Sequence, residues 1–411
     1  MYNLLKGLRI VEGASFIAAP SCGLHLLQLG AEVIRFDPIG GGPDYRRWPQ
    51  SRSGASLYWE GLNKGKKSIA LDLARPEGRD LAVRLATAPG ENGGIFLTNY
   101  PAQGFLAHDK LAAIRADLIT VRVLGWADGS PAVDYTINSA VGLPYMTGPA
   151  SPGDAPVNHV LPAWDLLTGA SAAYALLAAE RFRRETGRGQ EVRVPLSDIA
   201  LATLSHLGQI AEVTQSGADR PRMGNELFGA FGRDFVTRDA KRIMIVAITA
   251  RQWSGLIQAL DLGEAIAQLE TNLGVSFARD EGHRFVHRAP LFALVEKGLA
   301  SKNLVELKPA FDRLGVCWGP YQTLTQAVTG DDRFADNPIL TAVTHPSGER
   351  YPTAGPGVTF TGMDRASMSP TPRLGEHTDM ILADVLGLPD HEIGQLHDQG
   401  LVAGIRDGTV A

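Results

Sequence analysis

Cysteine is scarce in this sequence, with only Cys22 and Cys317 among 411 residues. Two cysteines cannot build a disulfide framework, and such sparse use is typical of a reducing compartment. The first residues lack the basic segment and apolar core of a secretion signal. No apolar run reaches the length that spans a bilayer. We therefore expect a cytoplasmic protein.

The sequence also lacks a surplus of positive charge. Its 39 Lys and Arg are outnumbered by 44 Asp and Glu, giving a net charge of -5 without any basic block. Neither nucleic acid nor a membrane surface is therefore an expected partner. Hydrophobic residues make up 44%, which suits a globular protein, and the length calls for two domains.

Several catalytic motifs are missing. Residues 61–68 resemble a phosphate-binding Walker A loop, but the glycine spacing is too short and Lys67 occupies the Ser/Thr position. No Gly-x-Gly-x-x-Gly follows the first expected strand, and no Gly-x-Ser-x-Gly is present. His283 and His287 lie four apart without a glutamate after the first, so a solvated helix face is favoured over a metal pair. We expect no metal site.

The sequence alternates short apolar runs with separate stretches of helical periodicity. Strand, helix and strand in succession form parallel sheets, so the first ~200 residues predict a doubly wound, Rossmann-like α/β domain. Strands are expected at 8–12, 31–37, 67–73, 94–99, 118–124 and 191–194, and helices at 20–29, 76–86, 110–116, 165–184 and 196–213.

A stretch rich in glycine and polar residues near 215–234 suggests a domain boundary. We expect the large domain to comprise residues 1–215, with a smaller α+β domain at 216–325. Residues 326–411 would return to complete the large domain.

Asp165 stands between an extended apolar run and a long Ala/Leu-rich helix. At a helix N-terminus an acid can cap the free amides. It can instead be a desolvated carboxylate with a chemical role. From this stretch alone the cap is the favoured interpretation.

Two glycine-rich stretches are ambiguous. Residues 40–42 are glycines that follow a strand and precede Arg46 and Arg47. They can bind phosphate or carboxylate, or form a plain surface loop. Residues 224–234 can form a mobile flap or, as we favour, a hairpin.

Taken together, these segments resemble the class III CoA transferases, a family that includes formyl-CoA transferase and α-methylacyl-CoA racemase. The resemblance is carried by residues 5–12, 18–20, 29–37, 63–72, 75–78, Asn99, Arg181 and 186–190. It implies an interlaced homodimer in which each chain forms a ring threaded by the other. It also implies that Asp165 is the catalytic aspartate, which forms covalent acyl and CoA intermediates. The amides at the helix start would then stabilise the developing oxyanion.

Within the family, the segments at 34–42, 158–165 and 374–379 imply transfer of CoA between the C1 and C4 carboxyls of mesaconate. The substrate would be the acyl-CoA thioester of this small dicarboxylic acid, with no cofactor beyond its CoA moiety. The alternative is transfer between two different dicarboxylates. A non-catalytic CoA-binding relative is a third possibility.

Residues that differ from those of other family members narrow the activities that we expect for this protein. Val133 stands where the racemases have a histidine, so one of two bases for proton exchange is missing. Ile17 stands where formyl-CoA transferase has a glutamine, so a polar contact to the acyl group is lost. Ala230 and Phe231 interrupt that enzyme's glycine flap, and a bulkier flap would close over the substrate.

The resemblance implies further contacts. Asp37, Asn99 and Tyr135 align with residues near CoA, and Lys66 or Lys67 would meet its phosphates. Gln103 replaces the arginine usual in the family. Arg46 or Arg47 would bind the free carboxylate, and His159 is either a substrate contact or a structural residue.

Overall fold

The computed structural model describes residues 1–149 and 155–405, which group into two compact units. The first unit contains residues 1–141, 159–212 and 336–411, and the second contains 142–158 and 213–335. The expected boundaries differ most at 142–158, which we had placed in the large domain. Hydrogen bonds tie this segment to the second unit: the Gly224 amide donates to the Gly148 carbonyl at 2.9 Å, and Arg222 Nε donates to the Tyr145 carbonyl at 3.0 Å.

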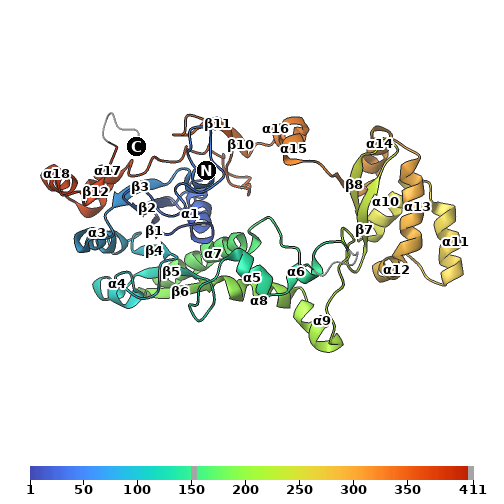
Figure 1. Ribbon diagram of the computed structural model, residues 1–411, viewed down its shortest axis with the longest axis horizontal. Coiled ribbons are helices and arrows are strands. Elements are labelled where there is room, and N and C mark those ends of the chain that lie inside the picture. Colours follow the sequence, from blue (N-terminus) through green and yellow to red (C-terminus); the bar gives the residue numbers. More distant parts are fainter. Residues whose placement is uncertain (150–154, 406–411) are drawn as a thin grey trace. The chain divides into compact units, whose positions relative to one another are not determined.

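The first unit is built on a seven-stranded sheet in the order β12-β3-β2-β1-β4-β5-β6 (Figure 1). Its strands are β1 (Arg9–Gly13), β2 (Glu32–Pro38), β3 (Lys67–Leu71), β4 (Ile95–Thr98), β5 (Ile119–Leu124), β6 (Gln190–Pro195) and β12 (Val402–Ala403). All pairings are parallel except that of β12 with β3. The order 3-2-1-4-5-6 is that of a doubly wound sheet, so the expected mixed α/β fold with a large parallel sheet is confirmed.

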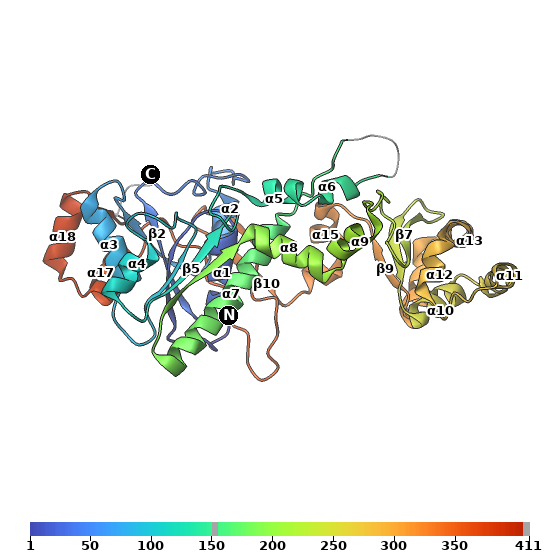
Figure 2. The same cartoon turned by 90° about the horizontal axis from the view of Figure 1, so that it is seen from below.

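Helices cover both faces of this sheet (Figure 2). One face carries α1 (Ala18–Gln28), α7 (Ala163–Thr186) and α8 (Leu196–His206). The other carries α3 (Pro76–Ala86), α4 (His108–Ile114), α17 (Thr378–Leu386) and α18 (Asp390–Asp398), whose apolar side chains form one core with the strands. The remaining elements of this unit are α2 (Leu57–Asn63), α5 (Asp134–Ala140), and the antiparallel hairpin of β10 (Leu340–Thr344) and β11 (Arg350–Ala354).

The prediction of a single helix at 196–213 is wrong. The segment is broken into α8 and α9 (Gln209–Ser216), because Gly208 adopts a left-handed conformation with φ of 74°.

Helices α1 and α7 pack closely, and Gly169 permits the contact. A Cβ placed on Gly169 would lie 2.0 Å from Ser21 Oγ and 2.6 Å from the Ala18 carbonyl oxygen. Gly169 lies one turn after Asp165, so this crossing brings the start of α7 toward the residues that precede α1.

The second unit has a three-stranded antiparallel sheet of β7 (Phe231–Val236), β8 (Arg242–Ala247) and β9 (Cys317–Pro320). Its helices are α6 (Leu143–Met146), α10 (Ala250–Ala259), α11 (Gly263–Leu273), α12 (Glu281–Val286), α13 (Arg288–Ala300), α14 (Leu304–Leu314), α15 (Leu324–Gly330) and α16 (Asp332–Ala335). Aromatic and aliphatic side chains from the sheet, α10, α13 and α14 share one core. Across both units, no described helix is both long enough and apolar enough to span a membrane.

Candidate active site

The candidate site lies where parallel strands of the first unit end. The strand order reverses between β1 and β4, and doubly wound sheets bind ligands at this point, beyond the carboxyl ends of the strands. Asn99, just after β4, accepts a hydrogen bond from the Ser15 amide at 3.1 Å and donates to the Ser15 carbonyl at 2.8 Å. The loop after β1 is thereby fixed. Asn99 thus has a structural role here, and its expected contact with CoA stays a prediction.

Asp165 lies in the first turn of α7, but it does not cap the helix. The cap is Asp134, from the start of α5, whose Oδ2 accepts from the Trp164 amide at 2.6 Å and from the Asp165 amide at 3.1 Å. The third free amide, that of Ala163, donates to the Leu161 carbonyl at 2.8 Å. Capping by Asp165, the favoured interpretation of its sequence stretch alone, is therefore wrong.

The same contacts overturn the expectation that the helix start supplies an oxyanion site. The amides of Ala163, Trp164 and Asp165 all have acceptors within the protein. Their partial positive charge still acts at short range, but none of the three donates to a ligand in this arrangement. A developing oxyanion therefore needs another donor.

The Asp165 carboxylate is set apart from ordinary surface acids. It is partly buried, and within the described residues it makes no hydrogen bond or ion pair. Burial, with the adjacent Asp134 carboxylate, raises the pKa of Asp165 to about 7, against an opposing effect of Arg47. A carboxylate with this pKa is a stronger nucleophile than that of an ordinary aspartate, and about half of the group is ionised at pH 7.

Arg47 and Tyr58 lie close enough to Asp165 for their charges to influence one another, and sequence analysis did not identify Tyr58. The Arg47 guanidinium lies over two rings, 5.5 Å from the centre of Phe16 and 5.4 Å from that of Tyr58. Within the described residues this guanidinium has no hydrogen-bond or ion-pair partner. The buried Tyr58 hydroxyl is likewise unpartnered there. Burial raises the pKa of Tyr58 well above its usual value, with Arg47 opposing and Asp165 contributing, so the hydroxyl stays protonated.

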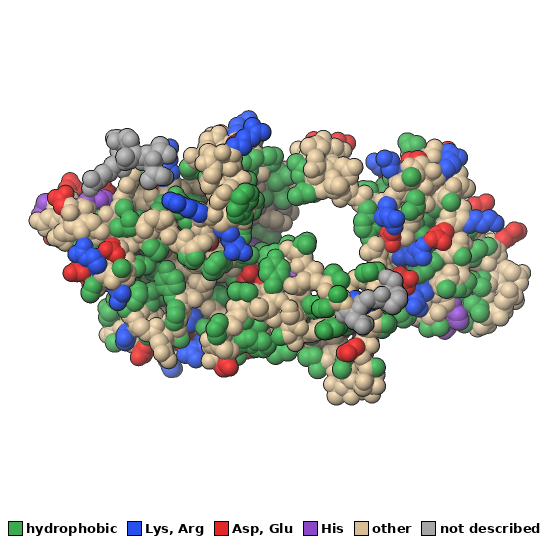
Figure 3. Space-filling view, viewed as in Figure 1, with side chains coloured by type: hydrophobic (Ala, Val, Ile, Leu, Met, Phe, Trp, Pro, Cys, Tyr) green, Lys and Arg blue, Asp and Glu red, His purple; other side chains and the backbone are tan. Residues whose placement is uncertain are grey.

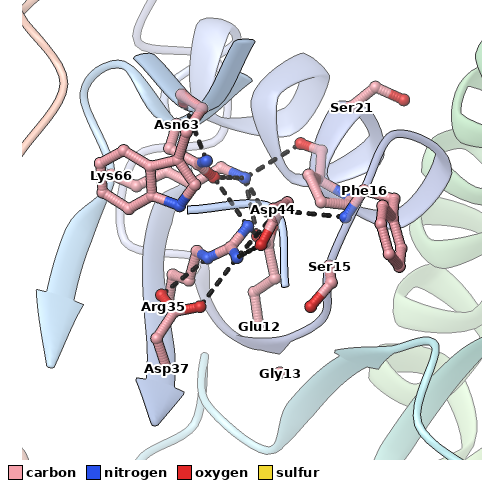
Figure 4. Close-up of polar contacts among 12 residues, drawn as sticks. Glu12, Gly13, Ser15, Phe16, Ser21, Arg35, Asp37, Asp44, Asn63 and Lys66 are labelled. Carbon is pink, nitrogen blue, oxygen red and sulfur yellow. Dashed lines mark hydrogen bonds and ion pairs between the residues drawn. The ribbon is translucent and has the colours of Figure 1, made fainter. Parts of the chain in front are cut away.

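A buried ion network supports the loop that carries Arg47 (Figure 4). Arg35 donates to both oxygens of Asp37 at 2.8 Å and to both oxygens of Asp44 at 3.1 Å. Asp44 in turn accepts from the Phe16 amide at 3.0 Å, which holds Phe16 at a φ of 69°, a conformation that a bulky residue rarely adopts. Asp37 is 2% exposed, so its expected role near CoA is replaced by a structural one.

Lys66 belongs to the same network and does not meet a phosphate. Its side chain is fully buried and donates to both Glu12 oxygens at 2.7 and 2.8 Å, to the Pro20 carbonyl at 3.0 Å and to Asn63 Oδ1 at 3.0 Å. The expectation for Lys66 is wrong, because buried partners already use its protons.

Lys67 has its own partner. It pairs with Glu32, the first residue of β2, and so points toward the amino-terminal edge of the sheet. Its expected role at the CoA phosphates stays a prediction.

Phe231 is a core residue of the second unit. It opens β7, is fully buried and packs against Phe235, Trp253 and Phe292. The expected flap role of Phe231 is therefore wrong.

Of the remaining residues expected to contact substrate or CoA, some are exposed and others have partners within the protein. Arg46 is exposed, and Ile17 is partly exposed just before α1. His159 Nε2 lies 3.0 Å from Asp134 Oδ1, which gives it a structural partner. Tyr135 is 41% exposed and donates to the Val160 carbonyl at 3.3 Å. For these four residues the role in binding stays a prediction.

The described residues contain no group of three or more His, Cys, Asp or Glu side chains placed to hold a metal ion. The side chains that influence one another at the start of α7 are the Asp165 carboxylate, the Arg47 guanidinium, which has no ion pair among the described residues, and the protonated Tyr58 phenol. Such a set can attack a carbonyl carbon, bind a carboxylate and donate to an oxyanion.

Comparison with known proteins identifies the family of this chain. Residues 5–378 match the model of CoA-transferase family III. The chain is 51% identical over 406 residues to 2-methylfumaryl-CoA isomerase of Chloroflexus aurantiacus, spanning 98% of this chain and 99% of that protein. It is 28% identical over 414 residues to succinyl-CoA–D-citramalate CoA-transferase of the same organism, spanning 97% and 98%. A CAIB/BAIF family protein from Brucella suis has a TM-score of 0.74 at 25% identity, over 94% of this chain and 100% of that one. The chain therefore belongs to CoA-transferase family III.

Proposed function

We propose that this protein moves CoA between the C1 and C4 carboxyls of 2-methylfumarate (mesaconate), with Asp165 as the nucleophile. The observation that carries the proposal is the Asp165 carboxylate, which is partly buried, makes no hydrogen bond among the described residues and lies within electrostatic reach of Arg47 and Tyr58. The identity of 51% to a 2-methylfumaryl-CoA isomerase over nearly the whole chain supports this substrate.

The first half of the reaction releases the acid. An Asp165 oxygen attacks the C1 thioester carbonyl, a C–O bond forms and the C–S bond breaks, giving a mixed anhydride and CoA thiolate. The thiolate then attacks the Asp165 carbonyl carbon. A new C–S bond forms, the anhydride C–O bond breaks, and free mesaconate leaves an aspartyl-CoA thioester.

The second half reverses these steps at the other end of the acid. The C4 carboxylate attacks the aspartyl-CoA carbonyl and expels CoA thiolate, giving a second anhydride. The thiolate then attacks the C4 carbonyl and returns the Asp165 carboxylate. No atom is gained or lost and no oxidation state changes, so the reaction needs neither an oxidant nor a second carboxylic acid as substrate.

Arg47 and Tyr58 supply the hydrogen-bond donors that the occupied amides at the start of α7 do not offer to the substrate. The guanidinium, supported by two aromatic rings, presents its donors to the carboxylate of the substrate that is not acylated. The buried Tyr58 hydroxyl has no hydrogen-bond partner in the part of the chain that the structure describes, and it donates to the oxyanion of the tetrahedral intermediate. Holding the free acid at Arg47 favours its reuse over its escape.

Transfer between two different acids is the second candidate. It is favoured by the 28% identity to a succinyl-CoA–D-citramalate CoA-transferase. The two candidates share every covalent step and differ only in whether the released acid leaves before it is reacylated.

One experiment tests the function and separates these candidates. Mesaconyl-C1-CoA is incubated with the protein, with and without isotopically labelled free mesaconate. We expect the C4 thioester to form without label, whereas label in the product would support intermolecular transfer. Absence of turnover with any acyl-CoA would favour a non-catalytic CoA-binding protein. Asp165→Ala should abolish turnover, and an active Asp165→Ala variant would refute the covalent mechanism.

The CoA moiety is proposed to lie along Asn99 and Tyr135, beyond the strand ends. We also propose an interlaced homodimer. Hydrophobic side chains are exposed on the first unit (Figure 3), and α9 buries none of its residues. The exposed apolar residues on α7, α8 and the segment that follows include Tyr174, Leu201, Leu207, Ile210 and Val213. A second copy would cover them. Light scattering on the purified protein, giving the mass of one chain or two, tests this.

A further inference from the structure

Asp134 has contacts that an ordinary surface acid lacks. It is the first residue of α5, is 1% exposed, and uses both carboxylate oxygens within the protein. Oδ2 accepts from the amides of Trp164 and Asp165, and Oδ1 lies 3.0 Å from His159 Nε2.

The contacts of Asp134 replace an N-terminal cap that α7 lacks within its own sequence. A helix is normally capped by a polar side chain at the residue just before it. That residue here is Pro162, which has no side-chain hydrogen-bonding group, and it makes no cap bond to α7. Two of the amides that α7 leaves free, those of Trp164 and Asp165, are therefore held by an acid from a different helix.

We propose that Asp134 is a positioning residue for the reaction: it fixes the first turn of α7 and leaves the Asp165 carboxylate unbonded beside a second negative charge. This inference rests on the proposed role of Asp165 as the nucleophile. If Asp165 had to cap its own helix, its lone pairs would be engaged and its basicity lowered. With Asp134 as the cap, they stay directed to the thioester carbon.

The groups that set the charge around Asp165 come from four places. Asp134 on α5 opposes its ionisation, and Arg47 in the loop after β2 favours it. Tyr58 on α2 stays neutral, as its burial dictates. His159, in the segment before α7, acts through its contact with Asp134.

Asp134→Asn is the decisive variant, because it keeps an amide acceptor for α7 and removes the charge. Asp134→Ala removes both. Asp109→Asn, which neutralises an exposed acid in the first turn of α4, is the matched control. Each protein is labelled without substrate by a water-soluble carbodiimide and an amine over a pH series, and modification of Asp165 is read by peptide mass spectrometry. Carbodiimide reacts with the protonated acid, so the midpoint follows the titration of Asp165.

We expect Asp134→Asn to move the labelling midpoint to lower pH by roughly one pH unit, with the control unchanged. The acid limb of kcat/KM should move in parallel, and kcat at pH 8 should fall about tenfold. An unmoved midpoint in Asp134→Asn would overturn the proposal and leave Asp134 a cap alone.

Hydrogen exchange at the Trp164 and Asp165 amides provides a second readout. It should remain slow in Asp134→Asn and become fast in Asp134→Ala, and equally slow exchange in both would also overturn the proposal. Labelling needs no turnover, so a shifted midpoint in a protein inactive on mesaconyl-CoA would refute the proposed function separately.

Discussion

The carboxylate of Asp134 accepts a hydrogen bond from the backbone amide of Asp165 at 3.1 Å, so two acids from different helices meet at one helix start. Their tasks are divided. Asp134 is almost fully buried and both its carboxylate oxygens are engaged, whereas the Asp165 carboxylate is partly exposed and makes no hydrogen bond among the described residues. This division explains how a carboxylate can lie at a helix N-terminus and still have a pKa of about 7, which suits its proposed attack on a thioester.

The raised pKa of Asp165 predicts a pH-dependent stability. Because the folded protein binds this proton more tightly than the unfolded chain, stability falls as pH rises from about 4 to about 7. The penalty is fully present above pH 7. Asp165→Asn should therefore be more stable than the wild type at pH 8, by on the order of 1–3 kcal/mol after allowance for partial exposure.

This gain should shrink at pH 5 and vanish near pH 3.5, as measured by urea unfolding at each pH. Asp109→Asn, which removes an exposed charge, should show no comparable trend. Activity requires the ionised acid, so kcat/KM of the wild type should decline below about pH 7. A flat difference in stability between pH 5 and pH 8 would contradict the raised pKa.

Arg47 should distinguish dicarboxylic substrates from monocarboxylic ones. Loss of a charge-assisted contact of about 1.5–3 kcal/mol predicts a roughly tenfold to hundredfold lower kcat/KM for mesaconyl-CoA in Arg47→Ala. Steady-state kinetics with mesaconyl-CoA and with a monocarboxylic acyl-CoA measure the contrast. The effect should be small for the second substrate, and Arg47→Lys should restore little, because lysine lacks the planar fork.

Arg46→Ala is the matched control, since Arg46 is the adjacent arginine and is exposed like Arg47, whereas the two ring contacts are those of Arg47. We expect it to change kcat/KM less than threefold. Equal losses in the two variants would show that general positive charge, and not the guanidinium held between Phe16 and Tyr58, binds the acid.

Tyr58→Phe should separate stability from activity. The hydroxyl is buried without a partner, so its removal relieves an unsatisfied polar group and should raise stability by about 0.5–1 kcal/mol. If the hydroxyl donates to the oxyanion, kcat should fall by about 10-fold to 100-fold with little change in KM. Thermal unfolding and kinetics on one preparation measure both quantities. An unaltered kcat would remove Tyr58 from the mechanism.

Substitutions of Lys66 and of Lys67 should differ in their effect on the stability of the protein. Lys66→Met removes both hydrogen bonds to the buried Glu12 carboxylate and leaves only the Arg35 guanidinium, at 3.6 Å, to oppose its charge, so it should destabilise the protein by about 3–5 kcal/mol. Lys67→Met removes a half-exposed pair with Glu32 and should lower stability by less than about 1 kcal/mol. Urea unfolding compares the two variants. In folded Lys66→Met the KM for the CoA thioester should be unchanged, and a large rise would restore its expected role at the phosphates.

Much of the sheet is predictable from the sequence because its strands are short apolar runs separated by helical periodicity. The six parallel strands fall within a residue or two of their expected positions. The short helices α2 and α5 were missed, since seven residues carry too little periodicity to be distinguished from a loop. These two helices of seven residues supply Tyr58 and Asp134, so residues of the candidate site lie on elements that the sequence pattern does not reveal.

The sequence by itself determined the family and the parallel sheet, and it predicted Asp165 as the candidate nucleophile, because order and spacing along the chain carry those signals. Only the tertiary structure decided which charges are used internally. Lys66 and Asp37 look available in the sequence, yet burial pairs them with Glu12 and Arg35. Asp134 looks unremarkable there, yet it holds the helix on which Asp165 stands. Whether a charged side chain faces a ligand or a neighbour depends on partners distant in the chain, which local pattern does not encode.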